Sequence, residues 1–248
     1  MEVKKRGYNK DLLTLTKKPK GATIIEGFPG FGLVSTISTG FLLDHLKCEK
    51  IGGYYFENAM PTLAIHQCKI VDPIGIYYCK KHNLVIVHAV TSVVGLEWAA
   101  AELIKDLAKR IQSKQIISIE GVGAAQKPGK EPSAFYFTKN PGLKKKAEKS
   151  GYACIGEGII VGVTSALLLR EDMPHLCVFA EAHTKLPDSK AAAKVIEALD
   201  KYLGLNVDYK PLLKQAEEFE KKLKGILEQA QKVQQKTVKD KKKLSYIA

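Results

Sequence analysis

The sequence lacks long hydrophobic runs and any recognisable targeting segment. No apolar stretch approaches the roughly 20 residues that a membrane-spanning helix needs. The first 20 residues are rich in lysine and are not followed by the apolar core and small-residue cleavage site of a secretion signal. The sequence therefore predicts a cytoplasmic protein with no membrane partner. Its 45% hydrophobic and 26% charged residues also exclude a disordered or collagen-like chain.

Cysteine is scarce and irregularly placed. The five cysteines are Cys48, Cys68, Cys79, Cys154 and Cys177. An odd number at wide spacings matches neither a disulfide framework nor a CxxC metal or redox motif. We therefore expect them to be buried as small hydrophobic residues.

Basic residues are in excess, and the excess lies at the two ends of the chain. The formal net charge is +13; residues 1–20 hold seven basic and two acidic residues, and residues 208–248 hold eleven and six. A nucleic-acid-binding domain usually concentrates its basic residues on a folded face. Nucleic acid is therefore not the favoured partner.

Short apolar runs alternate with amphipathic patterns through the middle of the chain. The expected strands are residues 22–26, 51–56, 63–68, 74–79, 84–90, 116–120, 155–161 and 176–181. The expected helices are residues 33–45, 95–111, 143–149, 164–170 and 190–203. Continuous apolar strands such as residues 84–87 need cover on both faces. The sequence predicts an α/β fold, a three-layer sandwich with a mixed, mostly parallel sheet and an antiparallel meander within residues 51–90.

Capping signals mark the end of this core. Asp188 or Ser189 can cap the helix over residues 190–203, and Gly204 offers its stop. A second helical pattern then begins at Pro211, with apolar residues at alternating steps of four and three for more than three heptads. This pattern is typical of a helix that packs along a narrow seam against another helix.

The second helix predicts a long C-terminal helical arm or an oligomer-forming coiled coil; a helix folded back over the core is the alternative. The residues proposed for its oligomer seam are Leu212, Phe219, Leu223 and Ile226. The expected divisions are a basic N-terminal segment (1–20), an α/β core domain (21–205), a C-terminal helical extension (206–243) and a docking tail (244–248).

Two glycine-rich turns each follow an expected strand. Residues 27–32 read Gly-Phe-Pro-Gly-Phe-Gly, and residues 120–125 read Glu-Gly-Val-Gly-Ala-Ala. Such turns can hold an anion at the carboxyl end of a sheet, but neither has a phosphate-binding spacing or a following lysine. A structural turn or a protein-contact loop is favoured over phosphate binding, with Phe28 and Phe31 as the candidate contact residues.

No catalytic or metal-binding constellation emerges from the sequence. The six histidines have no compact ligand spacing, and no GxSxG motif is present. Glu181 and His183 could act as an acid and a base, but a hydrogen-bonded cap or surface pair is the favoured interpretation. Ser35, Cys79 and Cys154 have no identifiable catalytic partners. We expect no enzyme activity, no catalytic residue, no cofactor and no metal.

A set of motifs across the core carries a family resemblance. They are Gly-Phe-Pro-Gly-Phe-Gly-Leu-Val at 27–34, Phe-Leu-Leu-Asp-His at 41–45, Glu-Gly-Val-Gly at 120–123, Phe-Ala-Glu-Ala-His at 179–183, Pro-Asp at 187–188 and Ala-Ala at 191–192. With these motifs the chain resembles the proteasome-assembly-chaperone-two family, and most of all its archaeal members. The resemblance implies a nucleoside-phosphorylase-like α/β fold used for protein binding, in a homotetramer or homopentamer. It also implies the 20S proteasome α-ring as partner, with a homologous subunit as a further candidate.

The last five residues resemble the docking tails of other proteasome partners. Those tails end in a hydrophobic residue, a tyrosine and any residue, and they enter pockets between α-subunits. Here the residues are Leu244, Ser245, Tyr246, Ile247 and Ala248, so the tyrosine stands third from the end rather than second. The resemblance assigns docking to Leu244, Tyr246, Ile247 and Ala248. Several tails on one oligomer would bind with avidity.

The sequence thus leads to one favoured function and two alternatives. The favoured function is a homo-oligomeric proteasome-binding protein that acts as an assembly scaffold or activator. The first alternative is an enzyme for a nucleoside- or nucleotide-like ligand at the glycine-rich turns; converging carboxylates around a pocket would favour it, and Phe28 and Phe31 filling the space would count against it. The second alternative is a nucleic-acid contact through the basic C-terminal arm.

Overall fold

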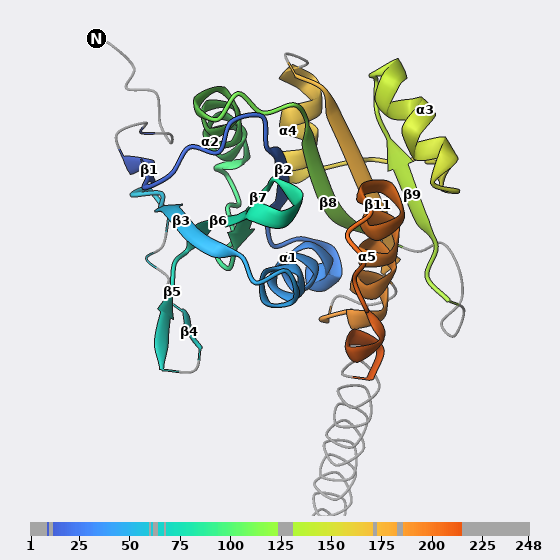
Figure 1. The fold of residues 1–248 in the computed structure, drawn as a ribbon, viewed down its shortest axis with the longest axis horizontal. Helices are drawn as coiled ribbons and strands as arrows, with labels where there is room; N and C mark the ends of the chain where they lie inside the picture. Colours follow the sequence, from blue (N-terminus) through green and yellow to red (C-terminus); the bar gives the residue numbers. More distant parts are fainter. Residues whose placement is uncertain are drawn as a thin grey trace, which may run out of the picture.

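The computed structural model describes residues 9, 12–59, 61, 64–66, 68–123, 131–170, 173–182 and 186–214. These residues form a mixed sheet with helices on both faces, together with a small hairpin (Figure 1). The sheet strands are β1 (Thr14–Leu15), β2 (Thr23–Gly27), β3 (Glu49–Tyr54), β6 (Ile74–Cys79), β7 (Leu84–Ala89), β8 (Ile116–Gly123), β9 (Ala134–Phe137), β10 (Ala153–Cys154) and β11 (His175–Ala182). Their order is β1-β3-β6-β7-β2-β8-β11-β9-β10, and β4 (Ala64–His66) pairs with β5 (Lys69–Val71).

The centre of the sheet is parallel and its flanks are largely antiparallel. Strands β7, β2, β8 and β11 run parallel to one another. On one side, β3, β6 and β7 form an antiparallel meander, and on the other β9 pairs antiparallel with β11. The predicted α/β fold with a mixed, largely parallel sheet is confirmed, and the antiparallel meander predicted within residues 51–90 is present.

Two hydrophobic clusters cover the two faces of this sheet. The helices are α1 (Val34–His45), α2 (Glu97–Arg110), α3 (Pro141–Lys149), α4 (Gly162–Arg170) and α5 (Ser189–Leu203). Residues of α2 and α4 pack with Ile24 on one face, whereas residues of α1, α3 and α5 pack with Ile25 on the other. Alternate residues of β2 therefore point to opposite faces, as the strand periodicity requires. We call these the α2/α4 face and the α1/α5 face.

The sheet edges differ from the expectations in two places. The predicted strand over residues 155–161 is wrong, because β10 ends at residue 154 and the following residues form an irregular connection to α4. Gly156 and Gly158 remove side chains that a strand would pack, and Ile159 is 92% exposed. In its place β9, which was not predicted, pairs with β11. In addition, β1 joins the sheet from within residues 1–20.

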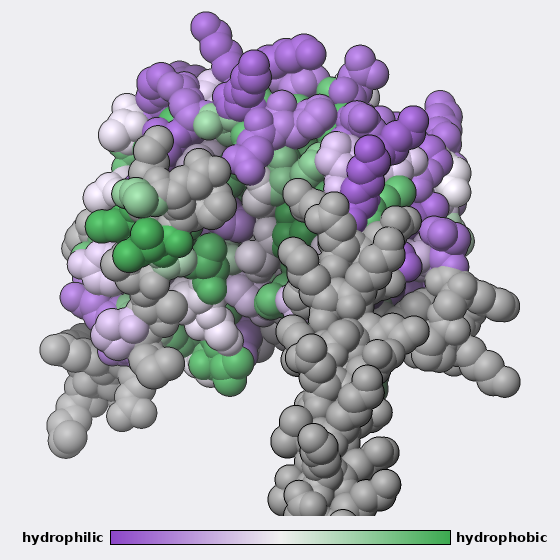
Figure 2. All heavy atoms as spheres, turned by 90° about the horizontal axis from the view of Figure 1, so that it is seen from below, coloured by the Kyte–Doolittle hydropathy of each residue, from purple (hydrophilic) through white to green (hydrophobic). Residues whose placement is uncertain are grey.

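The β4–β5 hairpin exposes a pair of apolar side chains. Ile65 and Ile70 face each other across the two strands and are 71% and 66% exposed. The hairpin stands away from the main sheet (Figure 1). Figure 2 shows hydrophobic side chains in patches on the lower face of the molecule, one of them at the left, where Figure 1 places the hairpin.

The expectation that all cysteines are buried and unpaired is wrong. Cys48 and Cys79 form a disulfide, with their Cα atoms 4.4 Å apart. The antiparallel register of β3 and β6 sets Glu49 opposite Tyr78, which brings the two cysteines together from 31 residues apart. Of the free cysteines, Cys68 and Cys154 are exposed and Cys177 is buried. Sequence spacing could not reveal this pair because the strand register creates it.

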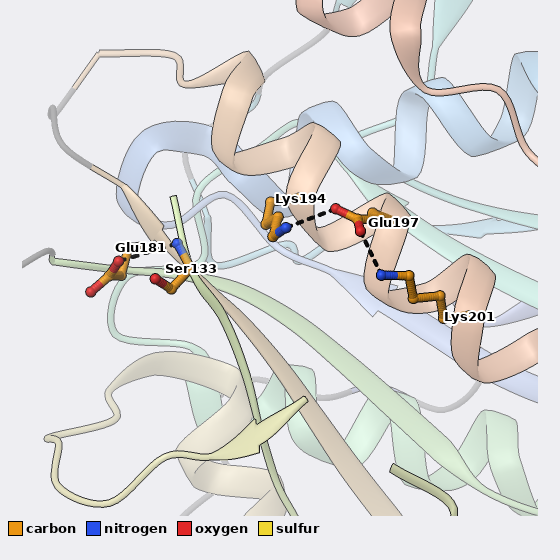
Figure 3. Close-up of polar contacts among 5 residues, drawn as sticks. All are labelled: Ser133, Glu181, Lys194, Glu197 and Lys201. Atoms are coloured by element: carbon orange, nitrogen blue, oxygen red, sulfur yellow. Dashed lines mark hydrogen bonds and ion pairs between the residues drawn. The ribbon is translucent and has the colours of Figure 1, made fainter. Parts of the chain in front are cut away.

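Helix α5 has the predicted caps and a charged outer surface. The Asp188 carboxylate accepts a hydrogen bond from the Ala191 amide at 2.9 Å, and Gly204 ends the helix with a φ of 66°. On the outside, the Glu197 carboxylate pairs with Lys194 at 2.8 Å and with Lys201 at 2.6 Å (Figure 3). Such surface pairs contribute little to stability, so the apolar inner face holds the helix in place.

The chain continues to pack against the body after α5. Residues 210–214 are helical, as Pro211 predicted. Leu205, Val207 and Leu212 are buried in the cluster of the α1/α5 face. The body therefore includes these residues beyond position 205. Within the described residues, no helix has the length and apolar character needed to cross a membrane.

Candidate functional site

A pocket of about 440 Å³ lies at the carboxyl end of the central strands on the α2/α4 face. It is bounded by the ends of β2 and β8, the turn that follows β2, the start of α2 and the connection into α4. Open α/β sheets place their ligands at this end of the strands. Both glycine-rich turns of the sequence line the pocket, so they do flank one crevice.

Two glutamates converge on this pocket from neighbouring strands. Glu26 lies on β2 and Glu120 on β8, and both line the pocket. The parallel register sets Glu26 beside Ser118, two residues before Glu120. All three residues therefore face the same side of the sheet. Glu26 is the last residue but one of β2, Glu120 lies three residues before the end of β8, and both carboxyls are largely removed from water.

The glycines that follow these glutamates serve helix packing. A Cβ atom at Gly27 would lie 2.8 Å from the Ser35 carbonyl oxygen, and one at Gly121 would collide with the carbonyl oxygen of Phe31. Both positions face the α1/α5 side, where only glycine lets α1 and the 3-10 turn η2 (Phe31–Leu33) approach so closely. Gly27 and Gly121 therefore serve close packing of α1 and η2 on the sheet. The acidic lining of the pocket does not suit the phosphate group considered from the sequence.

Burial changes the acidity of both carboxyls. Removal from water raises the pKa of Glu26 to about 8, helped by the charge of Glu120 and opposed by a hydrogen bond with Ser118. Burial likewise raises the pKa of Glu120 to about 7, and a hydrogen bond with Thr164 opposes this rise. At neutral pH Glu26 is therefore mostly protonated and Glu120 is partly protonated.

Glu26 is linked through hydrogen bonds to two further buried polar side chains, Ser118 and His175. The Ser118 hydroxyl hydrogen-bonds with Glu26 and lies 2.7 Å from Nε2 of His175 on β11. Burial lowers the pKa of His175 to about 4, so its ring is neutral. Among the described residues, Oε1 of Glu26 and Oε2 of Glu120 have no hydrogen-bond partner. Each glutamate therefore keeps an oxygen available to a molecule in the pocket.

The rim of the pocket is apolar and exposed. Val94, Ile159 and Val161 line it and are 86%, 92% and 65% exposed. Clustered apolar side chains around an opening commonly mark a binding site. The site thus combines an acidic floor with hydrophobic walls.

The structure separates the two phenylalanines proposed as contact residues. Phe28 is buried in the cluster of the α2/α4 face, whereas Phe31 is 37% exposed. Both line the pocket without filling it. Of the other predicted site residues, Leu212 is buried against the body. Those outside the described residues are Phe219, Leu223, Ile226, Leu244, Tyr246, Ile247 and Ala248.

Glu181 has a structural contact, and its proposed partner lies outside the described residues. The Glu181 carboxylate accepts a hydrogen bond from the Ser133 amide at 3.1 Å, which ties the start of β9 to β11 (Figure 3). His183 is not among the described residues. The contact agrees with the hydrogen-bonded interpretation of Glu181. Among described residues, no group of three His, Cys, Asp or Glu side chains is arranged to hold a metal ion.

Sequence reasoning missed the two pocket glutamates, although a signal was present. The tripeptide Ile-Glu-Gly occurs at residues 25–27 and again at residues 119–121. A glutamate inside an apolar strand is costly to bury and so points to a special environment. Its repetition at two strand ends could have indicated that both carboxyls share one site.

Comparisons with known proteins give a consistent family. A family model described as "PAC2 family" matches residues 24–227. The crystal structure of Pyrococcus furiosus PbaA, described as an archaeal homolog of proteasome-assembly chaperone, superposes with a TM-score of 0.79 at 29% identity, covering 92% of this chain and 96% of that chain.

Two further relatives extend the comparison. Pyrococcus furiosus PbaB, described as an archaeal proteasome activator, gives a TM-score of 0.74 at 24% identity, covering 86% of this chain and 97% of that chain; this likeness shows the fold alone. A Methanocaldococcus jannaschii protein described as uncharacterized is 26% identical over 220 residues, which are 88% of this chain and 90% of that protein.

Proposed function

The chain belongs to the PAC2 family, and from that premise we propose that it is a non-enzymatic, homo-oligomeric protein that binds the 20S proteasome. It acts as an assembly-chaperone-like scaffold or as an activator. One observation carries the proposal, the likeness to PbaA over 92% of this chain at 29% identity. Glu26 and Glu120 converge on the pocket and Phe28 and Phe31 leave it open, which is the geometry named above as favouring an enzyme for a nucleoside-like ligand. The comparisons give that alternative no support, so it stays second to proteasome binding.

The proposed contact with the proteasome α-ring is the C-terminal tail. Leu244, Tyr246 and Ile247 offer apolar area, and a tyrosine can bury its ring while its hydroxyl keeps a hydrogen bond. Lysines at 241–243 precede the tail and suit an acidic rim. One short tail binds weakly, so we infer that several tails of an oligomer dock together.

Self-association is the second part of the proposal. We assign seam contacts to Phe219, Leu223 and Ile226 in the helical extension, and the burial of Leu212 in the body favours an arm that begins after it. The exposed Ile65 and Ile70 pair of the β4–β5 hairpin provides a second apolar surface for a neighbouring copy. We propose a homotetramer or homopentamer, in which a homologous subunit can also take part.

The remaining assignments follow from the same premise. We propose a basic N-terminal segment (1–20), a nucleoside-phosphorylase-like core (21–205), a helical extension (206–243) and a docking tail (244–248). The buried residues after position 205 support a core that extends a short way into the third division. A cytoplasmic location and the absence of a cofactor complete the proposal.

The test compares binding of the full chain, a chain lacking residues 244–248, Tyr246→Ala and Ser245→Ala to an archaeal 20S particle at matched salt. We expect the truncation to abolish binding and Tyr246→Ala to weaken it at least about tenfold, the usual cost of removing a buried aromatic anchor. Ser245→Ala is the control and should bind like the full chain. Light scattering of the same samples gives the subunit number.

Two outcomes would overturn parts of this proposal. Absence of binding by the full chain would remove the proteasome as partner. Equal binding by the truncated chain would remove tail docking and move the contact to the body. Duplex DNA at the same salt serves as the comparison for the nucleic-acid alternative, which requires strong, salt-sensitive binding that is lost without residues 208–248.

A further inference from the structure

The pocket between β2, β8 and the start of α4 has an unusual charge for this protein. The chain carries a net charge of +13, yet the charged side chains among the described pocket residues are all acidic. They are Glu26, Glu97 and Glu120. Because the described lining holds acidic and no basic side chains, the pocket favours a cation over an anion.

We propose that this pocket binds an organic cation, a primary ammonium or guanidinium group carried on an apolar carbon chain. The cationic group contacts Glu26 and Glu120 on the pocket floor. The carbon chain lies between Phe31 of the turn, Ile160 of the connection into α4 and Val163 in the first turn of α4. The volume of about 440 Å³ is in the usual range of small-ligand sites.

The hydrogen-bonding groups of the floor are the first argument. Glu26 is only 1% exposed, and its Oε1 atom has no partner among the described residues. Oε2 of Glu120 is buried in the same unpartnered state. A buried acceptor without a donor costs stability, and an ammonium or guanidinium group supplies several donors at once. The ligand would therefore complete contacts that the folded chain leaves open.

The electrostatics of the floor are the second argument. Burial holds the pKa of Glu26 at about 8 and that of Glu120 at about 7, so at neutral pH the first carboxyl is mostly protonated and the second partly protonated. A bound cation favours the charged carboxylates and expels these protons. The other titratable groups near the pair are Cys177 and His175 on β11 and Glu97 of α2, and His175 is neutral behind Ser118. Strand β7 places Val87 beside Glu26, and α4 contributes Thr164.

Other ligand classes fit the pocket less well. An anion would meet three carboxyl groups. A metal ion would need a closely spaced ligand cluster, which the described residues do not contain. A neutral alcohol could hydrogen-bond to the floor, but it would not exploit the charge of the carboxylates. The apolar walls favour a cation with a carbon chain over a small inorganic one.

The test uses n-hexylamine as the probe and n-hexanol as its neutral analogue, each titrated calorimetrically into the full chain at pH 7. We expect n-hexylamine to bind with a dissociation constant of about 1 mM, a typical affinity for so small a ligand, and at least about tenfold more tightly than n-hexanol. Repeating the titration in phosphate and in MOPS, neither of which carries a primary ammonium group, gives the protons released, expected to be about one per bound amine.

Three variants locate the site. Glu26→Gln and Glu120→Gln should each weaken n-hexylamine about tenfold or more and reduce proton release. Glu197→Gln removes the same charge from α5, whose outer surface lies on the other side of the sheet, and should bind like the parent chain. A melting curve of each variant shows whether it is folded. If one glutamate variant does not fold, the binding by the other variant and the number of protons released by the parent chain still test the site.

Clear outcomes overturn the proposal. Absence of n-hexylamine binding up to 20-fold above the expected dissociation constant would reject the site. Equal affinity for n-hexanol, or unchanged binding by both glutamate variants, would reject the cationic ligand class. The proposal does not depend on proteasome binding, because Glu26→Gln leaves the tail intact and the two activities are measured separately.

Discussion

The two faces of the central sheet meet their helices in different ways. On the α1/α5 face, Gly27 and Gly121 let backbone approach backbone, and the cluster there is almost wholly apolar. On the α2/α4 face, the residues beside those glycines are Glu26 and Glu120, which open onto a pocket. Each Ile-Glu-Gly sequence therefore places a close helix contact on one face and a carboxyl group on the other.

This difference assigns separate roles to neighbouring residues. Gly27 and Gly121 let α1 and η2 pack closely on the sheet, so they contribute to the stability of the fold. The glutamates cost stability, because burial disfavours their charged form. A protein that keeps two costly carboxyls at one pocket is expected to use them, whereas the packed face needs no such explanation.

The largest expected effect comes from filling the close contact on the α1/α5 face. Gly121→Ala places a methyl group against the carbonyl oxygen of Phe31, a backbone atom that moves only if η2 shifts. We expect a loss of about 3 kcal/mol in the free energy of unfolding, at the upper end for overpacking. Urea denaturation monitored by circular dichroism measures it.

Gly123→Ala provides the control two residues along the same strand. A Cβ atom there meets nothing within 4 Å, so its effect should stay within about 0.5 kcal/mol, as at ordinary surface positions. Equal stability of the two variants would contradict the assignment of Gly121 to close packing.

The second largest effect is the pH dependence of the free energy of unfolding, which arises from Glu26 on the α2/α4 face. The folded-state pKa of Glu26, about 8, exceeds the ordinary value of 4.5, so the folded chain retains a proton that the unfolded chain loses. Stability should therefore fall as pH rises from about 5 to 8, by at most about 1.4 kcal/mol per pH unit for this group. In Glu26→Gln the decrease in stability with pH should be smaller, because only Glu120, which acts over a narrower pH range, still contributes to it.

Lowering the pH should reduce the folding stability through a buried histidine on each face of the sheet. This acid limb serves as a comparison for the alkaline limb that depends on Glu26. Burial lowers the pKa values of His88, which contacts Thr39 on the α1/α5 face, and of His175 on the other face to about 4. Stability gained from these neutral histidines should be lost as pH falls from 6.5 towards 4. Urea midpoints from pH 4 to 9 measure both limbs. Parallel curves for the parent chain and Glu26→Gln above pH 6.5 would contradict the role of Glu26.

Local patterns predicted the elements, and non-local pairing decided the site. The strand over residues 22–26 and the helix over residues 33–45 follow from an apolar β-branched run, a glycine turn and helical spacing, all within one short segment. The connection at residues 155–161 has a similar apolar content. Apart from the Ile155 amide, which donates to the Tyr136 carbonyl of β9, its residues join no strand. Pairing of this kind depends on the whole fold and has no local signature.

The same limit explains the site. Glu26 and Glu120 are far apart in the sequence, and they meet only because β2 pairs with β8. The disulfide between Cys48 and Cys79 likewise depends on the register of β3 and β6. Phe28 and Phe31 belong to one motif, yet a single turn buries the first and exposes the second. Residue type and spacing gave candidates, but the strand order determined which of them share a surface.

The smallest expected effect tests how α5 is held on the packed face. The Asp188 side chain accepts a hydrogen bond from the Ala191 amide, whereas the Asp188 amide donates to the Gly32 carbonyl at 2.8 Å. Asp188→Ala removes the cap but keeps the backbone link, so the loss should be about 1 kcal/mol. Ser189→Ala, at the first helical residue, should change stability by less, since Asp188 holds the capping position. Urea midpoints measure both, and a larger loss for Ser189→Ala would reverse the assignment of the cap.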